Sequence, residues 1–167
     1  MDLFYGRNGH KQDIPQAIAI LEKGIAKFDH CTAWFLLGYI DIVGAAPYRP
    51  RDISAGVEKI VRAAKGGEAE AFMRLMGIYR NGHTYEGVYF EKNEALAGAY
   101  AVEIADAIDP SYDDRGMINA TAAWAYFYGH GVPKNRAKAA EYFRKIQPWN
   151  IGQVDEEIRN ELQKAGY

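Results

Sequence analysis

The sequence predicts an all-α solenoid of about three and a half helical-hairpin repeats, followed by a C-terminal capping helix. Two observations carry this prediction. Residues that cap helices recur about every 40 residues along the chain, and a second helical pattern that ends in glycine precedes three of them. The chain has 167 residues, 49% hydrophobic and 25% charged, which is enough for a single globular domain with a buried core.

Four similar helices are predicted to begin at Asp or Asn residues. The side-chain oxygen of such a residue accepts a hydrogen bond from the first unpaired N–H groups of a helix. The residue four positions later is always small and the residue eight positions later is apolar, which is helical spacing. The predicted caps are Asp13, Asp52, Asn93 and Asn135, and the small residues are Ala17, Gly56, Ala97 and Ala139.

A first helix is predicted ahead of each of the last three caps. These segments are Thr32–Gly44, Ala69–Gly82 and Ile118–Gly129. Each ends in glycine, which adopts the left-handed conformation after a helix at little cost. Small residues inside the segments, such as Gly38 and Ala122, allow the two helices of a hairpin to approach closely.

These helices divide the predicted domain, 1–167, into units at about 1–28, 29–66, 67–108 and 114–147. The first unit holds only the end of a first helix, so Met1–Gly9 is either part of a truncated repeat or an irregular lid. Because a solenoid must cover the apolar face of its last repeat, a capping helix is predicted at about 153–165. Its apolar face consists of Val154, Ile158, Leu162 and Ala165.

The charge balance argues against a nucleic-acid partner. Twenty Lys and Arg residues against 22 Asp and Glu residues leave a formal net charge of -2, without the basic field of a nucleic-acid binder. The segment Met1–Asp13 lacks the pattern of a signal peptide, and the longest apolar stretch is too short to cross a bilayer. Cys31 is the only cysteine, so no internal disulfide is possible. We therefore expect a cytoplasmic protein without a membrane partner.

The last unit carries the fullest set of motifs: "GHGV" at Gly129–Val132, a polar cap at Asn135, "KA" at Lys138 and "YFRK" at Tyr142–Lys145. In these motifs the chain resembles the Sel-one-like repeat family, a relative of the tetratricopeptide repeats. Further units supply "LLG" at Leu36–Gly38, "RAAKGG" at Arg62–Gly67 and "YRNG" at Tyr79–Gly82. The resemblance spans nearly the whole chain and implies a right-handed α-α solenoid that binds another protein.

Two turns depart from the family pattern. "GAAPYRPRD" replaces the Gly-x-Gly-Val turn in the second unit, and "HTYEGVYFEK" lengthens the turn of the third. Both are expected to be loops that present aromatic residues, which suits a specificity element.

The resemblance implies an adaptor or scaffold role. Some short bacterial members of the family resemble immunity proteins, which bind and neutralise a cognate toxin or effector, and the size of this chain favours that role. A general scaffold in signalling or complex assembly is the alternative, and a metal-dependent enzyme that uses His and Asp side chains is a third hypothesis.

The predicted partner-binding residues lie on the first helix of each unit, which lines the concave face in related arrays, and on the two long turns. Tyr, Trp and Arg prevail among them, and these types dominate interface hot spots. For Trp124 and Tyr128 the alternative is packing against the C-terminal helix. The predicted residues are Tyr39, Asp41, Tyr48, Arg74, Asn81, Tyr85, Tyr89, Thr121, Trp124 and Tyr128.

No catalytic, cofactor-binding or metal-binding residues are expected. His10, His83 and His130 each follow a glycine, and no pair of them has the spacing that places two imidazoles on one helix face. Because "RNGH" occurs twice, at Arg7–His10 and Arg80–His83, both copies are interpreted as helix stops. Cys31 next to His30 is interpreted as a packing residue. The acidic cluster Asp106, Asp109, Asp113 and Asp114 is interpreted as a solvated loop, because it lacks the pattern of a calcium site.

Overall fold

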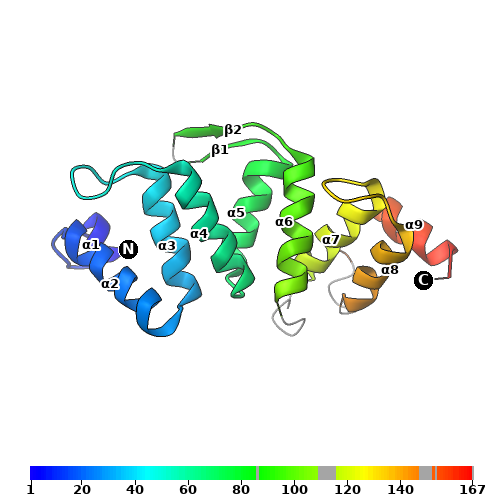
Figure 1. Ribbon diagram of the computed structural model, residues 1–167, viewed down its shortest axis with the longest axis horizontal. Helices are drawn as coiled ribbons and strands as arrows, with labels where there is room; N and C mark the ends of the chain where they lie inside the picture. Colours follow the sequence, from blue (N-terminus) through cyan, green and yellow to red (C-terminus); the bar gives the residue numbers. More distant parts are fainter. Residues whose placement is uncertain (86, 109–115, 147–151, 153, 167) are drawn as a thin grey trace. The chain divides into compact units, whose positions relative to one another are not determined.

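The structure is a computed structural model that describes residues 1–85, 87–108, 116–146, 152 and 154–166. The described residues form an all-α solenoid with one small β-hairpin (Figure 1). Two compact units are present. The N-terminal unit comprises Met1–Leu75 and Thr84–Tyr89, and the C-terminal unit comprises Met76–His83 and Phe90–Tyr167.

The helices of the N-terminal unit follow the predicted pattern. They are α1 (Asp2–Tyr5), α2 (Ile14–Phe28), α3 (Cys31–Val43), α4 (Ile53–Lys65) and the first half of α5 (Ala69–Arg80). The carboxylate of Asp13 accepts a hydrogen bond from the Gln16 N–H at 2.9 Å, and that of Asp52 accepts from the Ala55 N–H at 3.0 Å. Both side chains therefore cap a helix N-terminus as the sequence predicts.

The C-terminal unit contains the second half of α5 together with α6 (Glu94–Ala107), α7 (Met117–Tyr128), α8 (Arg136–Lys145) and α9 (Glu156–Lys164). Asn93 caps α6 and Asn135 caps α8 in the predicted manner. Ile158 and Leu162 of α9 are fully buried. Glu157 of α9 accepts a hydrogen bond from Tyr128 of α7, and Glu161 forms an ion pair with Arg136 of α8. The amphipathic C-terminal segment is thus a helix packed on the last hairpin, as predicted.

One backbone hydrogen bond recurs in all four hairpin turns. The N–H of the residue that caps the second helix donates to a carbonyl near the end of the first helix, and the glycine three residues after that carbonyl has a positive φ. The bonds are Asp13 to Leu3 (2.8 Å), Asp52 to Asp41 (2.8 Å), Asn93 to Tyr79 (2.7 Å) and Asn135 to Tyr126 (2.8 Å). The glycines are Gly6, Gly44, Gly82 and Gly129.

This recurring turn corrects the interpretation of the first "RNGH". Gly6 caps α1, whereas Gly9, the glycine of the first copy, lies in the following loop, where an added Cβ would meet no atoms within 4 Å. Gly82 of the second copy occupies the turn position. The two identical stretches are therefore not equivalent in the structure, because the first begins after the helix stop.

Glycine pairs bring the backbones of neighbouring segments into direct contact. A Cβ added to Gly38 of α3 would lie 2.7 Å from the carbonyl oxygen of Gly56 in α4, and the converse distance is also 2.7 Å. In the C-terminal unit, a Cβ on Gly131 would lie 1.9 Å from the Ala95 carbonyl oxygen, and a Cβ on Gly98 would lie 2.0 Å from that of His130. The Gly-x-Gly turn therefore serves two purposes, since Gly129 ends α7 and Gly131 admits the main chain of α6.

The long turn of the third unit is not a simple loop. It contains a two-stranded sheet formed by β1 (His83–Tyr85) and β2 (Val88–Phe90). Tyr85 and Phe90 are buried, whereas Tyr89 is 70% exposed. Aromatic and β-branched residues on both sides of Gly87 favour paired strands, which explains the difference from the expected loop.

Candidate interaction surface

Three of the predicted contact residues lie together in the N-terminal unit. The rings of Tyr39 (α3) and Tyr85 (β1) meet edge to face with centroids 6.0 Å apart. The guanidinium carbon of Arg74 (α5) lies 5.4 Å from the centroid of the Tyr85 ring. Glu70, one helical turn earlier, pairs with Arg74 at 2.7 Å. The hairpin thus brings Tyr85 between two helices that carry predicted contact residues.

Two residues that sequence reasoning missed extend this group. The Tyr5 hydroxyl of α1 is hydrogen-bonded to that of Tyr39, and the guanidinium carbon of Arg7 lies 4.5 Å from the Tyr5 ring centroid. The sequence offered a signal for Arg7, since it is the first residue of one of the two identical "RNGH" stretches. We call the complete set, Arg7, Tyr5, Tyr39, Tyr85 and Arg74, the arginine–tyrosine strip. Tyr5, Arg7 and Arg74 are exposed, Tyr39 is half-buried and Tyr85 is buried.

The two long turns that depart from the family pattern each carry one exposed tyrosine. Tyr48 in the α3–α4 turn is 58% exposed and Tyr89 on β2 is 70% exposed. Large exposed aromatic side chains on a rigid loop are typical of contact surfaces. Both residues are accessible where the sequence placed candidate contacts.

Asp41 has a different position from the one expected. Its side chain is only 3% exposed, and its carboxylate is paired with Arg49 and, at 2.8 Å, with Lys59. Arg49 also reaches Glu22 at 3.0 Å, and its hydrogen bond to Asp41 raises the pKa of its guanidinium. Asp41 is therefore not accessible to a partner. Its carboxylate is already occupied by the ion pairs with Arg49 and Lys59. The pair with Arg49 fixes the loop that carries Tyr48.

In the C-terminal unit, two predicted contact residues, Trp124 and Tyr128, lie beside His130. The imidazole stacks on Trp124 with centroids 4.4 Å apart, and Arg80 lies 4.5 Å from the same indole. His130 Nδ1 is 3.9 Å from the Glu94 carboxylate, and the Tyr128 ring lies 5.8 Å from the imidazole. Trp124 itself is buried, whereas Arg80, Glu94, Tyr128 and His130 around it are partly exposed.

Tyr128 packs against the C-terminal helix, which was the alternative interpretation. Its hydroxyl donates to Glu157 of α9 at 2.8 Å. Burial, followed by this hydrogen bond, raises the pKa of Tyr128 to about 12.

Thr121 is buried, and its hydroxyl donates to the Met117 carbonyl at 2.8 Å. It is therefore a packing residue of α7 and not an accessible contact. Asn81, at the end of α5, is exposed.

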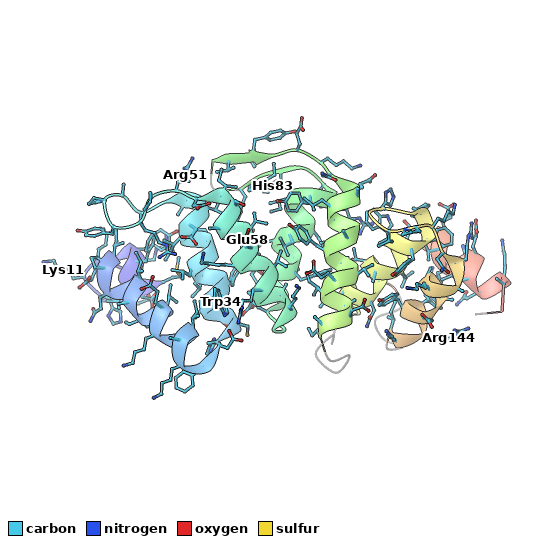
Figure 2. The ribbon with its side chains drawn as sticks, in the orientation of Figure 1. Lys11, Trp34, Arg51, Glu58, His83 and Arg144 are labelled. Carbon is cyan, nitrogen blue, oxygen red and sulfur yellow. The ribbon has the colours of Figure 1, made fainter. Side chains whose placement is uncertain are left out.

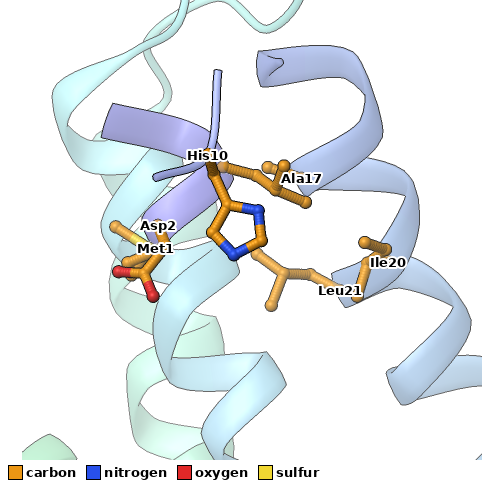
Figure 3. Close-up of a pocket in the computed structure, with 7 residues that line it drawn as sticks. Met1, Asp2, His10, Ala17, Ile20 and Leu21 are labelled. Atoms are coloured by element: carbon orange, nitrogen blue, oxygen red, sulfur yellow. The ribbon is translucent and has the colours of Figure 1, made fainter. Parts of the chain in front are cut away.

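A small pocket opens beside α1 and α2, with the imidazole of His10 pointing into it (Figure 3). Its volume is about 230 Å³, below the usual range of small-molecule sites. Aliphatic side chains form most of its wall, and Asp2 lies at its edge.

Among the described residues, no three His, Cys, Asp or Glu side chains gather where they could hold a metal ion. Asp106 accepts a hydrogen bond from the Tyr142 hydroxyl, whereas Asp109, Asp113 and Asp114 lie outside the described residues. No helix in the described part of the chain has the length and hydrophobicity needed to cross a membrane.

Comparisons with known proteins agree with the fold. Residues 3–27 and 118–146 match the model of the Sel1 repeat. The search of curated proteins gives no match. Among solved structures, the crystal structure of a Sel1 repeat protein from Oxalobacter formigenes is similar, with 21% sequence identity and a TM-score of 0.50. The alignment covers 98% of this chain and 59% of the other, so the chain spans less than two thirds of that protein.

Sel1 repeats generally mediate protein–protein interactions. Two segments near the ends of the chain thus match the Sel1 repeat, and the fold is similar to that of a Sel1 repeat protein.

Proposed function

We propose that this chain is a non-enzymatic protein-binding module and that the arginine–tyrosine strip is its main contact surface. The observation that carries the proposal is the continuous series of contacts from Arg7 through the three tyrosines to Arg74. Tyr and Arg dominate interface hot spots because each combines a large contact area with hydrogen-bonding capacity. Tyr48 and Tyr89 add accessible aromatic area in the same unit.

The strip has a defined charge pattern. An arginine lies at each end, and the carboxylate of Glu70 pairs with one of them, Arg74. Arginine forks bind carboxylates in two-point hydrogen bonds. We expect a partner surface that places carboxylates opposite Arg7 and Arg74 and apolar groups opposite the rings.

The finer role that we favour is that of a cytoplasmic immunity-type protein, which binds and neutralises one cognate toxin or effector. Mutual contacts hold the strip side chains in place, and prearranged surfaces support specific recognition, whereas promiscuous binders use flexible surfaces. A general scaffold for signalling or complex assembly is the alternative. For the C-terminal unit, we propose secondary contacts at the exposed Asn81 and at Arg80 and His130, which contact the Trp124 ring.

The test is co-purification of the tagged full chain from its native cells, followed by reconstitution with the recovered protein. We expect one polypeptide in near-equal amount, and we expect Arg74→Ala and Tyr39→Ala each to weaken its binding by about tenfold or more. Arg144→Ala is the control, since Arg144 lies in α8, outside the strip, and its loss should leave binding unchanged.

A growth assay separates the two roles. An immunity-type protein restores the growth of cells that express the recovered partner, and Arg74→Ala reduces this protection. A scaffold binds the partner without any such protection. Unchanged binding of both strip variants would overturn the choice of surface.

A further inference from the structure

A second group of side chains is organised around Asp29, at the end of α3 that lies away from Tyr48. The Trp34 indole N–H donates to Asp29 Oδ1 at 2.6 Å, and Arg62 Nη2 bonds to the two carboxylate oxygens at 3.0 and 3.2 Å. The Arg62 guanidinium carbon also lies 4.5 Å from the Trp34 ring centroid. Asp29 thereby connects the end of α2 with α3 and α4.

The backbone of Asp29 is unusual for its residue type. It ends α2 with φ 47° and ψ 39°, the left-handed conformation in which glycine is favoured. Ion pairs between exposed groups stabilise proteins little, and both Asp29 and Arg62 are exposed. A glycine would satisfy the backbone better, so stability alone does not account for the aspartate. What the aspartate adds is a fixed position for Trp34 and Arg62.

The exposed groups near Asp29 have a clear chemical character. Phe28, directly before Asp29, is 67% exposed, and the ammonium of Lys27 lies 5.0 Å from its ring centroid. Two rings and two cations therefore accompany one carboxylate, which already accepts hydrogen bonds from Trp34 and Arg62. The hydrogen bond from Trp34, and after it the one from Arg62, lowers the pKa of the Asp29 carboxyl below its ordinary value.

Arg62 keeps hydrogen-bonding capacity for a ligand. Among the described residues, its hydrogen bonds to Asp29 use Nη2 alone, which leaves the donors on Nε and Nη1. A carboxylate is the natural acceptor for these donors, and the neighbouring rings provide apolar area.

We propose that Lys27, Phe28, Asp29, Trp34 and Arg62, here called the Asp29 cluster, form a second docking surface for an acidic segment of a partner protein. The segment places a carboxylate against Arg62 and Lys27 and an aromatic or large apolar side chain against Phe28 and Trp34. Asp29 is a positioning residue, because it holds Trp34 and Arg62 in the arrangement that the segment meets. The Asp29 cluster shares no residue with the arginine–tyrosine strip. Figure 2 shows Trp34 toward one end of α3 and Arg51, which serves below as a control, toward the other.

The test uses the full chain and synthetic peptides, so it does not depend on the native partner. The probe is a short peptide with repeated Glu-Phe pairs, and its matched controls carry Lys-Phe or Glu-Ser pairs. The Trp34 indole N–H is observed by two-dimensional NMR and assigned by its loss in Trp34→Phe. We expect the Glu-Phe peptide to shift this signal in a saturable manner and both control peptides to bind about tenfold more weakly or not at all.

Variants separate a docking role from a structural one. Arg62→Gln and Asp29→Gly should each reduce the affinity for the Glu-Phe peptide about fivefold or more, while Asp29→Gly unfolds at the same temperature as the wild type or higher. Arg51→Gln is the control. Arg51 is an exposed arginine near the other end of α3, so its replacement should leave the affinity for the Glu-Phe peptide unchanged. Equal shifts with Glu-Phe and Lys-Phe peptides, or wild-type affinity in Asp29→Gly, would overturn the proposal.

Discussion

The backbone N–H of Asn93 donates to the Tyr79 carbonyl oxygen at 2.7 Å, so the third turn closes in the same way as the others although it contains a β-hairpin. The ends of this turn are fixed by that bond and by Gly82. Its length can therefore change without a change in the helices that it joins.

Replacing 83–92 by "HGVPK", the corresponding stretch of the last turn, should leave the helices intact. Halving a loop changes the loop-closure part of the free energy of unfolding by only about 0.6 kcal/mol, and the further loss from removing the buried rings of Tyr85 and Phe90 falls on the hairpin and not on the turns of the helices. The replacement removes Tyr85 and Tyr89, so we expect partner binding to fall while far-ultraviolet circular dichroism remains unchanged. A replacement that lost helical signal would show that the hairpin is needed for folding.

Asp41→Asn should destabilise the N-terminal unit by about 1–3 kcal/mol, because it removes a charge that is hydrogen-bonded to Arg49 and paired with Lys59. Urea denaturation measures the change. Glu22→Gln is the matched control, since its ion pair with Arg49 is exposed and should contribute less than about 1 kcal/mol. Equal effects of the two variants would mean that Asp41 is not the centre of this ion-pair network.

Gly131→Ala should prevent normal packing of α6 against the α7–α8 turn. Its methyl group would lie 1.9 Å from the Ala95 carbonyl oxygen, and its φ is +71°. We expect a loss of more than about 3 kcal/mol, since overpacking adds to backbone strain. The control is Gly87→Ala. Gly87 has a similar φ of +76°, but an added Cβ would meet no atoms within 4 Å, so this variant should lose only about 1–2 kcal/mol of unfolding free energy. Thermal unfolding of the two variants measures the difference. Similar losses in the two variants would exclude the close contact as the cause.

Tyr128 should make the C-terminal unit sensitive to alkali. Its pKa is about 12 in the folded chain, against 10.0 for an ordinary tyrosine, so the folded state keeps a proton that the unfolded state releases. The favourable contribution is complete below pH 10 and is lost as the pH rises toward 12. Denaturant titrations across this range should show a smaller decline for Tyr128→Phe. An identical decline in both proteins would assign the sensitivity to other groups.

Much of the fold could be predicted because local signals determine it. Asp13, Asp52, Asn93 and Asn135 cap helices as expected, since a side-chain oxygen acts on N–H groups only a few residues away. The β-hairpin was missed even though its aromatic residues flank a glycine. The family pattern suggested an enlarged loop, and the preference for strands is the weaker signal in so short a segment.

The positions of the candidate contact residues were predictable only in part, because burial depends on where distant residues lie. Tyr39, Arg74 and Tyr85 come together, yet Asp41 is enclosed by a cation from its own turn, and Thr121 is packed within the hairpin. The contacts of Asp29 have no sequence signal, because they depend on a left-handed backbone and on Arg62, which comes from a different helix.

The contacts of Gly98 and Gly131 have a consequence for how such turns can diversify. Main-chain atoms set the spacing between α6 and the α7–α8 turn, whereas the side chain between Gly129 and Gly131 only approaches Glu94 at the start of α6, at 3.9 Å. That position holds His130, which stacks on Trp124. Another residue at this position would give the turn a different surface chemistry at the same repeat spacing, so recognition and packing can change independently there.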